Sequence, residues 1–288
     1  MRDVQVEDLF TIEAESLKNL KPLYGVVFLF KYGAIDRQYA KDGNKPLDGI
    51  YDEKHHENGI VFANQTIHNA CGTQAMLNVL LNKDEQIDIG PELKNLKEFV
   101  ATFDSETAGE TLSNSELIRC AHNSFSAPAL FVDEDKPEPP QNYNDREDGI
   151  FHFIGYMYCH GQIYELDGLK RYPIKHGSCT LEDEFCEKLP EILQRRIAKY
   201  GDELRFSLLA ITNNKLRQYQ EQSNDFMVNH ELSKRELWKK ENELRRHDYL
   251  GLIVALLKNS TANIPESEWE QMLNDARKKS QSELLQNK

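Results

Sequence analysis

The segment 151–167 constrains the fold more than any other part of the sequence, because its apolar and polar side chains alternate on both sides of a short turn. Residues 151–158 (FHFIGYMY) and 163–167 (IYELD) predict two β-strands, and His160 and Gly161 between them predict a two-residue turn. Two such strands form a β-hairpin. We therefore expect an antiparallel sheet at the centre of the fold.

The turn also determines which side chains face one another. A two-residue turn places His152 opposite Leu169 and Ile154 opposite Asp167. His152 and Asp167 are then diagonal neighbours on one face of the hairpin, within reach of a hydrogen bond. An Asp that orients a catalytic His has this geometry, and so does a core His that is satisfied by an Asp. The hairpin alone leaves both interpretations open.

The rest of the sequence predicts an α+β fold, with helices around that sheet, and an all-helical extension from Asn213 onward. Ser113 begins a Ser-x-x-Glu capping-box pattern, which predicts that a helix starts there. The other predicted strands are 23–31, 60–65 and 204–212, and the predicted helices are 69–82, 91–103, 113–124 and about 184–200.

Composition argues against several classes of protein. A formal net charge of −13 disfavours a nucleic-acid-binding surface, and no apolar run approaches the roughly 18 to 20 residues of a membrane span. The N-terminus shows no signal-peptide pattern, so we expect a protein of the cytoplasm and the nucleus. An odd number of cysteines without an export signal predicts free thiols at Cys71, Cys120, Cys159, Cys179 and Cys186.

Cys71 is the thiol with the most reactive predicted setting. It follows the predicted strand 60–65 and lies at the start of the predicted helix 69–82, where unpaired backbone N–H groups favour the thiolate. Gln65, at the end of that strand, could donate its amide to the same point as the Cys71 N–H and so complete an oxyanion hole. A lone intracellular cysteine is more often a core residue, so this placement makes Cys71 a candidate only.

Other titratable residues carry weaker signals. Three histidines in polar loop or turn contexts are expected to be solvated: His55, His56 and His160. A zinc site at His176, Cys179 and Cys186 would lack a close Cys-x-x-Cys pair and a fourth ligand at a usual spacing. We therefore expect no metal and no cofactor.

Two motifs resemble the active-site blocks of the ubiquitin carboxyl-terminal hydrolase (UCH) family. They are residues 65–75 (QTIHNACGTQA), and residues 151–153 (FHF) together with 164–168 (YELDG). The resemblance extends over nearly the whole chain. Three further segments are similar to the proteasome-associated branch of the family: 20–31, 112–119 and 122–125.

The resemblance implies a papain-like UCH fold and a deubiquitinating thiol hydrolase that acts after the C-terminal glycine of ubiquitin. It makes Cys71 the nucleophile and His152 the general base and acid. Asp167 becomes the residue that orients the histidine, and Gln65 becomes the oxyanion-hole donor. These roles agree with those that the residue types and spacings suggest by themselves.

The resemblance also divides the chain into a catalytic domain (1–212), a helical connector (213–232) and a helical tail (233–288). Within the catalytic domain, the acidic, proline-rich segment 133–149 matches the crossover loop under which the ubiquitin tail threads. An inert surface loop is the alternative for this segment. The tail is expected to dock onto a proteasomal ubiquitin receptor and, in the nucleus, onto a subunit of a chromatin-remodelling complex, unless it packs on its own catalytic domain.

The sequence departs from the family pattern in two places. The family carries a further segment before the equivalent of Val4, including a helix that contacts ubiquitin, and it has a longer connector. We expect the shorter start to lower stability or activity. The competing functions are a catalytically weak ubiquitin-binding adaptor of the proteasome or a chromatin-remodelling complex, and a papain-like protease of other peptides.

Overall fold

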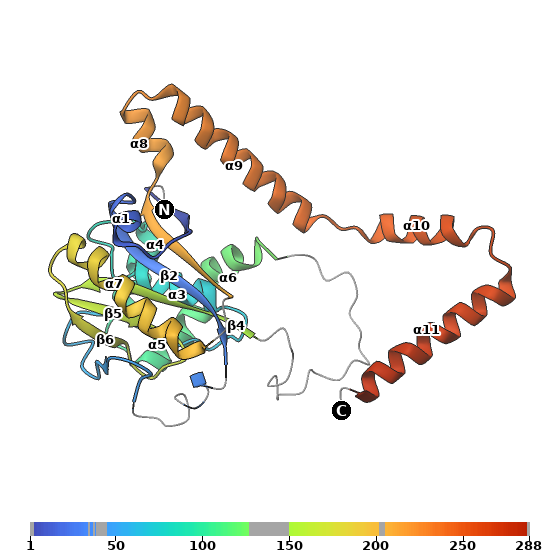
Figure 1. Ribbon diagram of the computed structural model, residues 1–288, viewed down its shortest axis with the longest axis horizontal. Helices are drawn as coiled ribbons and strands as arrows, with labels where there is room; N and C mark the ends of the chain where they lie inside the picture. The colour runs from blue at the N-terminus through green and yellow to red at the C-terminus, as the bar shows by residue number, and fades with distance from the viewer. Residues whose placement is uncertain are drawn as a thin grey trace. The chain divides into compact units, whose positions relative to one another are not determined.

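The computed structural model describes residues 3–33, 35, 36, 38, 45–126, 150–201 and 205–286. The chain forms two compact units (Figure 1). The sheet unit consists of residues 1–124 and 137–238, and the C-terminal unit consists of residues 125–136 and 239–288. The segment 133–149, predicted as the crossover loop, lies outside the described residues.

An antiparallel sheet runs through the sheet unit, with the strand order β1-β7-β2-β4-β5-β6-β3. The predicted α+β fold is therefore confirmed, although no pattern in the sequence predicted β1, β3 or β6. The strands are β1 (Val4–Leu9), β2 (Leu23–Tyr32), β3 (Ile50–Tyr51), β4 (Ile150–Cys159), β5 (Gln162–Leu166), β6 (Ile174–Ser178) and β7 (Phe206–Asn213).

Helices pack on both faces of the sheet, and further helices follow it in the chain (Figure 1). The sheet unit contains α1 (Ala14–Lys18), α3 (Cys71–Leu80), α4 (Pro91–Val100), α5 (Ser105–Ser113), α6 (Glu116–Asn123), α7 (Glu182–Ile197) and α8 (Lys215–Glu221). α9 (Asp225–Arg246) runs from the sheet unit into the C-terminal unit, which also holds α10 (Leu250–Thr261) and α11 (Glu266–Gln286).

The all-helical extension is thus confirmed, and residue 233, predicted as the start of the tail, lies inside α9. None of the helices that the structure describes is both long and apolar enough to cross a membrane.

Alternation along the central strands sends neighbouring side chains to opposite faces and so builds two hydrophobic cores. Val27 in β2 and Met157 in β4 belong to the core shared with α3, α4 and α5. Val26 and Tyr156 face the other way and join the core formed with α1 and α7. Because both faces of the sheet are buried against helices, close packing on two sides holds the strands that carry the site rigidly in place.

The β4–β5 hairpin has the register that its turn predicts. Gly155 pairs with Leu166, and the turn residues His160 and Gly161 have φ angles of 46° and 78°. A two-residue type I′ turn requires positive φ at both positions. Since β5 ends at Leu166, Asp167 lies directly beyond the ladder.

The predicted strand at 60–65 is wrong, because this segment pairs with no strand among the described residues. Two carboxamide side chains, Asn78 in α3 and Asn82 just beyond its end, take the place of a neighbouring strand. Asn78 accepts the Ala63 N–H at 3.0 Å and donates to the Ala63 carbonyl at 3.1 Å. Asn82 does the same for Val61, at 2.8 and 2.7 Å. The segment that leads to the active site is therefore fixed to α3 by carboxamides one helical turn apart.

The predicted helix over 113–124 is wrong at its start. Ser113 is the last residue of α5, and α6 begins after Ser115, whose hydroxyl accepts the Ile118 N–H at 3.5 Å. The sequence did not predict α5, whose residues SETAGETLS show little apolar periodicity. The signal that was available is Asp104, which caps this helix through the N–H groups of its first turn.

Candidate active site

Cys71 is the first residue of α3, where the N–H groups of the first turn have no partner within the helix. Its side chain is half-buried. Burial raises the pKa of the Cys71 thiol, but hydrogen bonds with His152 and with the N–H groups of Phe153 and Gly72 more than offset this, so the net pKa is lowered. The structure thus brings the predicted thiol and the predicted histidine together.

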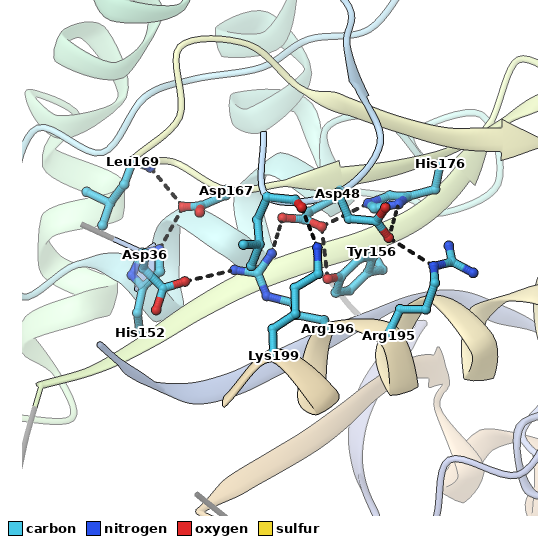
Figure 2. A network of polar contacts seen from close by, with 12 residues as sticks. Asp36, Asp48, His152, Tyr156, Asp167, Leu169, His176, Arg195, Arg196 and Lys199 are labelled. Atoms are coloured by element: carbon cyan, nitrogen blue, oxygen red, sulfur yellow. Dashed lines mark hydrogen bonds and ion pairs between the residues drawn. The ribbon is translucent and has the colours of Figure 1, made fainter. Parts of the chain in front are cut away.

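The predicted pair of His152 and Asp167 is also present (Figure 2). His152 Nε2 lies 2.7 Å from Asp167 Oδ1, and both side chains are buried. The same carboxylate oxygen accepts the Leu169 N–H at 3.0 Å. Because Nε2 faces the carboxylate, Nδ1 is the ring nitrogen that remains for the thiol.

The charges of these groups support one another. Burial opposes the charge on His152, but Asp167 and Cys71 together raise the pKa of the imidazole to about 9. Burial likewise opposes ionisation of Asp167, but the charge and hydrogen bond of His152 lower the pKa of this carboxyl to about 2. Asp167 is therefore a carboxylate and His152 an imidazolium at neutral pH, and the imidazolium favours the thiolate form of Cys71. Such a group can carry out nucleophilic attack and proton delivery.

Gln65 lies at the start of the turn that leads to Cys71, but its amide is engaged locally. Nε2 donates to the carbonyls of Ile67 and His68, at 3.0 and 3.1 Å. Oε1 is buried and has no hydrogen-bond partner in the described part of the chain. Two facing carbonyls determine which end of the carboxamide carries the NH₂ group. This amide must therefore give up one carbonyl before it can donate to an oxyanion.

Gly168 joins the two active-site segments. Its carbonyl accepts the Gln65 N–H at 2.8 Å and Asn64 Nδ2 at 3.2 Å. A Cβ at position 168 would lie 3.0 Å from Gln65 Cβ, which is too close without movement of the backbone. Sequence reasoning missed both Gly168 and Asn64. A glycine directly after a strand was the available signal, because it often marks a close backbone approach.

His55 corrects the prediction of a solvated side chain. It is buried, with Nδ1 3.0 Å from the Ile60 carbonyl oxygen and Nε2 3.2 Å from Ser105 Oγ. His176, weighed as a zinc ligand, instead has Nε2 2.9 Å from Glu165 Oε2. The residues that the structure describes contain no group of three or more side chains placed to hold a metal ion.

The chain matches known protein families. Residues 1–198 match the family described as "Ubiquitin carboxyl-terminal hydrolase, family 1". The chain belongs to this family. Residues 227–260 match a second family model, described as "Ubiquitin carboxyl-terminal hydrolases". The UCH relationship therefore extends into α9 and α10.

Several named proteins and solved structures are similar to this chain. Ubiquitin carboxyl-terminal hydrolase 2 of Schizosaccharomyces pombe is 40% identical over 97% of this chain and 91% of its own length. Ubiquitin carboxyl-terminal hydrolase ubh-4 of Caenorhabditis elegans is 34% identical over 88% of this chain and 79% of its own length. The structure of the Trichinella spiralis UCH37 catalytic domain bound to ubiquitin vinyl methyl ester is 34% identical, with a TM-score of 0.58, and covers 74% of this chain and 86% of that chain.

Family membership and these structures confirm the predicted UCH fold and identify the chain as a cysteine-type deubiquitinase. The roles of Cys71, His152, Asp167 and Gln65 stay predictions at this point.

Proposed function

We propose that this enzyme hydrolyses bonds after the C-terminal glycine of ubiquitin. Cys71 is the nucleophile, His152 is the general acid and base, and Asp167 orients the imidazole. The observation that carries the proposal is the buried His152–Asp167 pair, 2.7 Å apart, beside the Cys71 thiol. An imidazole that is held by a carboxylate through one nitrogen, with the other left for a thiol, is the arrangement that thiol hydrolysis requires.

The first half of the reaction forms a thioester. The Cys71 thiolate attacks the carbonyl carbon of the terminal glycine, and the carbonyl oxygen takes up the negative charge. The Cys71 N–H and the Gln65 amide stabilise this oxyanion, once Gln65 has released the carbonyl of Ile67 or His68. As the C–N bond breaks, the His152 imidazolium gives its proton to the leaving amine.

The second half releases ubiquitin. Neutral His152 takes a proton from a water molecule, whose oxygen attacks the thioester carbon. The intermediate then expels the Cys71 thiolate. The carboxylic acid of ubiquitin that forms releases its proton to solvent, which leaves the carboxylate of ubiquitin and the same imidazolium–thiolate pair with which the cycle began. Asp167 stays ionised throughout, since its pKa of about 2 lies far below neutral pH.

Two observations support ubiquitin as the substrate. The Trichinella spiralis UCH37 structures contain that protein bound to ubiquitin vinyl methyl ester. The net charge of −13 suits a partner such as ubiquitin, whose binding face is basic. The first observation has more weight, because net charge is shared by many unrelated proteins.

Ubiquitin that carries a C-terminal electrophile tests the nucleophile. We expect a one-to-one covalent adduct with the intact chain and no adduct with Cys71→Ala. Cys120→Ala is the matched control, because it removes an exposed thiol elsewhere and should react like the wild type. An adduct that survives Cys71→Ala would disprove the assignment. No adduct with the intact chain would favour the adaptor function instead.

For the C-terminal unit, we propose docking onto a proteasomal ubiquitin receptor and, in the nucleus, onto a chromatin-remodelling complex. The supporting observation is the exposed apolar surface of α10, where Leu252, Leu256 and Leu257 are each more than half exposed. An amphipathic or apolar helix with this much exposed apolar area provides a binding surface. These two partners would place the protein in both the cytoplasm and the nucleus.

Deletion of residues 239–288 tests the docking separately from catalysis. We expect the shortened enzyme to lose co-purification with the proteasome and to keep its cleavage of small ubiquitin adducts. The deletion starts after Trp238 because Lys234 pairs with Glu7, at 2.8 Å, within the sheet unit. Unchanged co-purification after this deletion would exclude docking through the C-terminal unit.

A further inference from the structure

Arg196 is a buried cation in a polar network that lies beside the His152–Asp167 pair (Figure 2). It lies in the last turn of α7 and is 3% exposed. Its Nη1 is 2.5 Å from Glu165 Oε1, and its Nη2 is 3.5 Å from Asp36 Oδ1. Buried ion pairs contribute little net stability, because desolvation offsets their attraction. Their position next to a reactive group is therefore informative.

Phe30 connects Arg196 to His152 by direct contact. The Arg196 Cζ lies 4.7 Å from the centre of the Phe30 ring, a distance typical of a cation–π interaction. Phe30 is also the cross-strand partner of His152 in the β2–β4 pair. Their ring centres are 5.8 Å apart, and the planes meet at 82°.

A second aromatic ring, Tyr32, meets the imidazole of His152 in the same edge-on manner, at 5.6 Å and 80°. Two rings thus restrict the imidazole in addition to its bond with Asp167, and one of them, Phe30, packs against Arg196. A movement of the Arg196 side chain would therefore displace Phe30 and, through it, the imidazole.

Charge connects Arg196 to the same pair. Burial opposes ionisation of Asp167, and Lys170 and Arg196 assist His152 in lowering the pKa of this carboxyl. Glu165 precedes Asp167 by two residues. Burial and, to a smaller extent, Asp167 act to raise the pKa of Glu165, while Arg196 and His176 act to lower it. Without the guanidinium, Glu165 would be a second anion competing with Asp167 for the positive charge of the imidazolium.

We propose that Arg196 is a positioning residue for deubiquitination. It holds Phe30 against the His152 ring, and it neutralises Glu165 behind the carboxylate that orients the imidazole. Both effects keep the imidazole turned toward the Cys71 thiol. This inference rests on the proposed function, because it has meaning only if the imidazole and the thiol carry out the reaction.

The variants must avoid simple unfolding. Removing Arg196 alone leaves Glu165 and Asp36 as buried carboxylates without their cation, which is strongly destabilising. The double variant Glu165→Gln/Arg196→Met removes one charge of each sign and preserves side-chain length, and Asp36 keeps the Tyr200 hydroxyl at 2.7 Å. Because this variant also neutralises Glu165, it isolates the contact of Arg196 with Phe30. Arg196→Lys keeps the charge but loses the planar guanidinium. Arg195→Gln is the matched control, since it removes the same charge one residue away, from an exposed side chain that pairs with Asp48 at 3.1 Å.

Hydrolysis of a fluorogenic amide at the C-terminus of ubiquitin separates kcat from KM. We expect the double variant to lower kcat about 10- to 100-fold, the typical cost of misplacing a catalytic group by up to about 1 Å. KM should change by less than about twofold, because ubiquitin binding is untouched. Arg196→Lys should fall between the double variant and the wild type, and Arg195→Gln should match the wild type.

The rate at which iodoacetamide alkylates Cys71 is measured as a function of pH. This pH dependence would not change if Arg196 only stabilised the fold. An imidazolium turned away from the sulfur no longer stabilises the thiolate, so the alkylation profile of the double variant should shift to higher pH. Circular dichroism shows whether each variant is folded. If the double variant is not folded, kcat and the alkylation profile of the Arg196→Lys variant test the inference instead.

A folded variant with wild-type kcat and a wild-type alkylation profile would overturn the inference. An increase in KM without a decrease in kcat would also overturn it. An equal decrease of kcat in Arg195→Gln would do the same. Failure of the proposed function has a different signature. In that case the ubiquitin electrophile still labels Cys71→Ala or fails to label the wild type, whatever residue occupies position 196.

Discussion

The two units of this protein use their apolar side chains in opposite ways. In the sheet unit, the largest apolar and aromatic side chains are enclosed between the sheet and its helices, and Tyr156, Tyr164 and Phe28 are less than 2% exposed. In the C-terminal unit, none of the described residues of α10 is buried, and Leu256 is 58% exposed. The difference lies in packing, because both units contain helices with many apolar residues.

This contrast indicates where each unit obtains its stability. The sheet unit closes two cores on itself and can hold a catalytic geometry to within a fraction of an ångström. Helices as short as α10 (Leu250–Thr261) are marginal in water without packing partners. The contrast supports the proposal that the sheet unit carries the chemistry and that the C-terminal unit offers surface to a partner.

The largest effect should separate the two units by activity. We expect His152→Ala to lower turnover of a ubiquitin amide about 10²- to 10⁴-fold, because the general acid and base is lost. Leu256→Ala in α10 should leave turnover unchanged, since that side chain is exposed. Wild-type turnover in His152→Ala would exclude the proposed triad.

Core truncations should separate the units by stability. Leu189 is fully buried in the core between the sheet and α7, so Leu189→Ala should lower the free energy of unfolding by about 2 to 5 kcal/mol. Leu256→Ala should change it by less than about 0.5 kcal/mol. Urea unfolding monitored by circular dichroism measures both. Equal losses would show that the C-terminal helices are packed as tightly as the core.

The pH dependence of stability should come from the sheet unit. The pKa of Asp167 is lowered to about 2, so its contribution is complete above its ordinary pKa and is lost as the pH falls through about 2. The pKa of His152 is raised to about 9, so its contribution is complete below its ordinary pKa and is lost as the pH rises through about 9.

Unfolding free energies between pH 2 and pH 10 test this expectation. The wild type should show a plateau from about pH 4 to about pH 6.5 with a decline on each side, set by the ordinary pKa values of Asp and His. Truncation of residues 239–288 should leave the two declines in place, because the pair lies in the sheet unit. His152→Ala should weaken the decline on the alkaline side, and an unchanged curve in that variant would rule out the pair as its source.

The smallest effect concerns the junction of the units inside α9. A chain that ends after Trp238 keeps Arg235, which donates to Glu231 at 2.5 Å and to Gln5 at 2.7 Å. A chain that ends after Leu232 loses this arginine and leaves the buried Glu231 carboxylate unpaired. We expect the shorter chain to be less stable by about 1 to 3 kcal/mol in thermal or urea unfolding. Equal stability would move the boundary of the sheet unit toward the N-terminus of α9.

Local signals predicted the parts of the site that lie close together in the sequence. The turn at His160 and Gly161 determined the register of the hairpin and so the adjacency of His152 and Asp167. The apolar period that starts near Cys71 predicted the helix that carries the thiol. In both cases neighbouring residues decide the geometry, because a turn or a helix is specified by contacts a few residues apart.

Contacts between distant segments were not predictable in this way. β1 pairs with β7 across some two hundred residues of chain, and no short pattern marks its partner. Asn78 and Asn82 supply hydrogen bonds that a strand would otherwise supply to Val61 and Ala63, and the spacing of four residues between them gives no sign of it.

The sequence by itself determined the hairpin, the helix that begins at Cys71 and the residue types of the candidate triad, because short-range geometry follows from turn and helix chemistry. Only the tertiary structure decided that the Gln65 N–H meets the Gly168 carbonyl and that Arg196 lies against Phe30. Those positions depend on how α7, β2 and the active-site turn pack together, and packing is set by the whole core rather than by any local stretch.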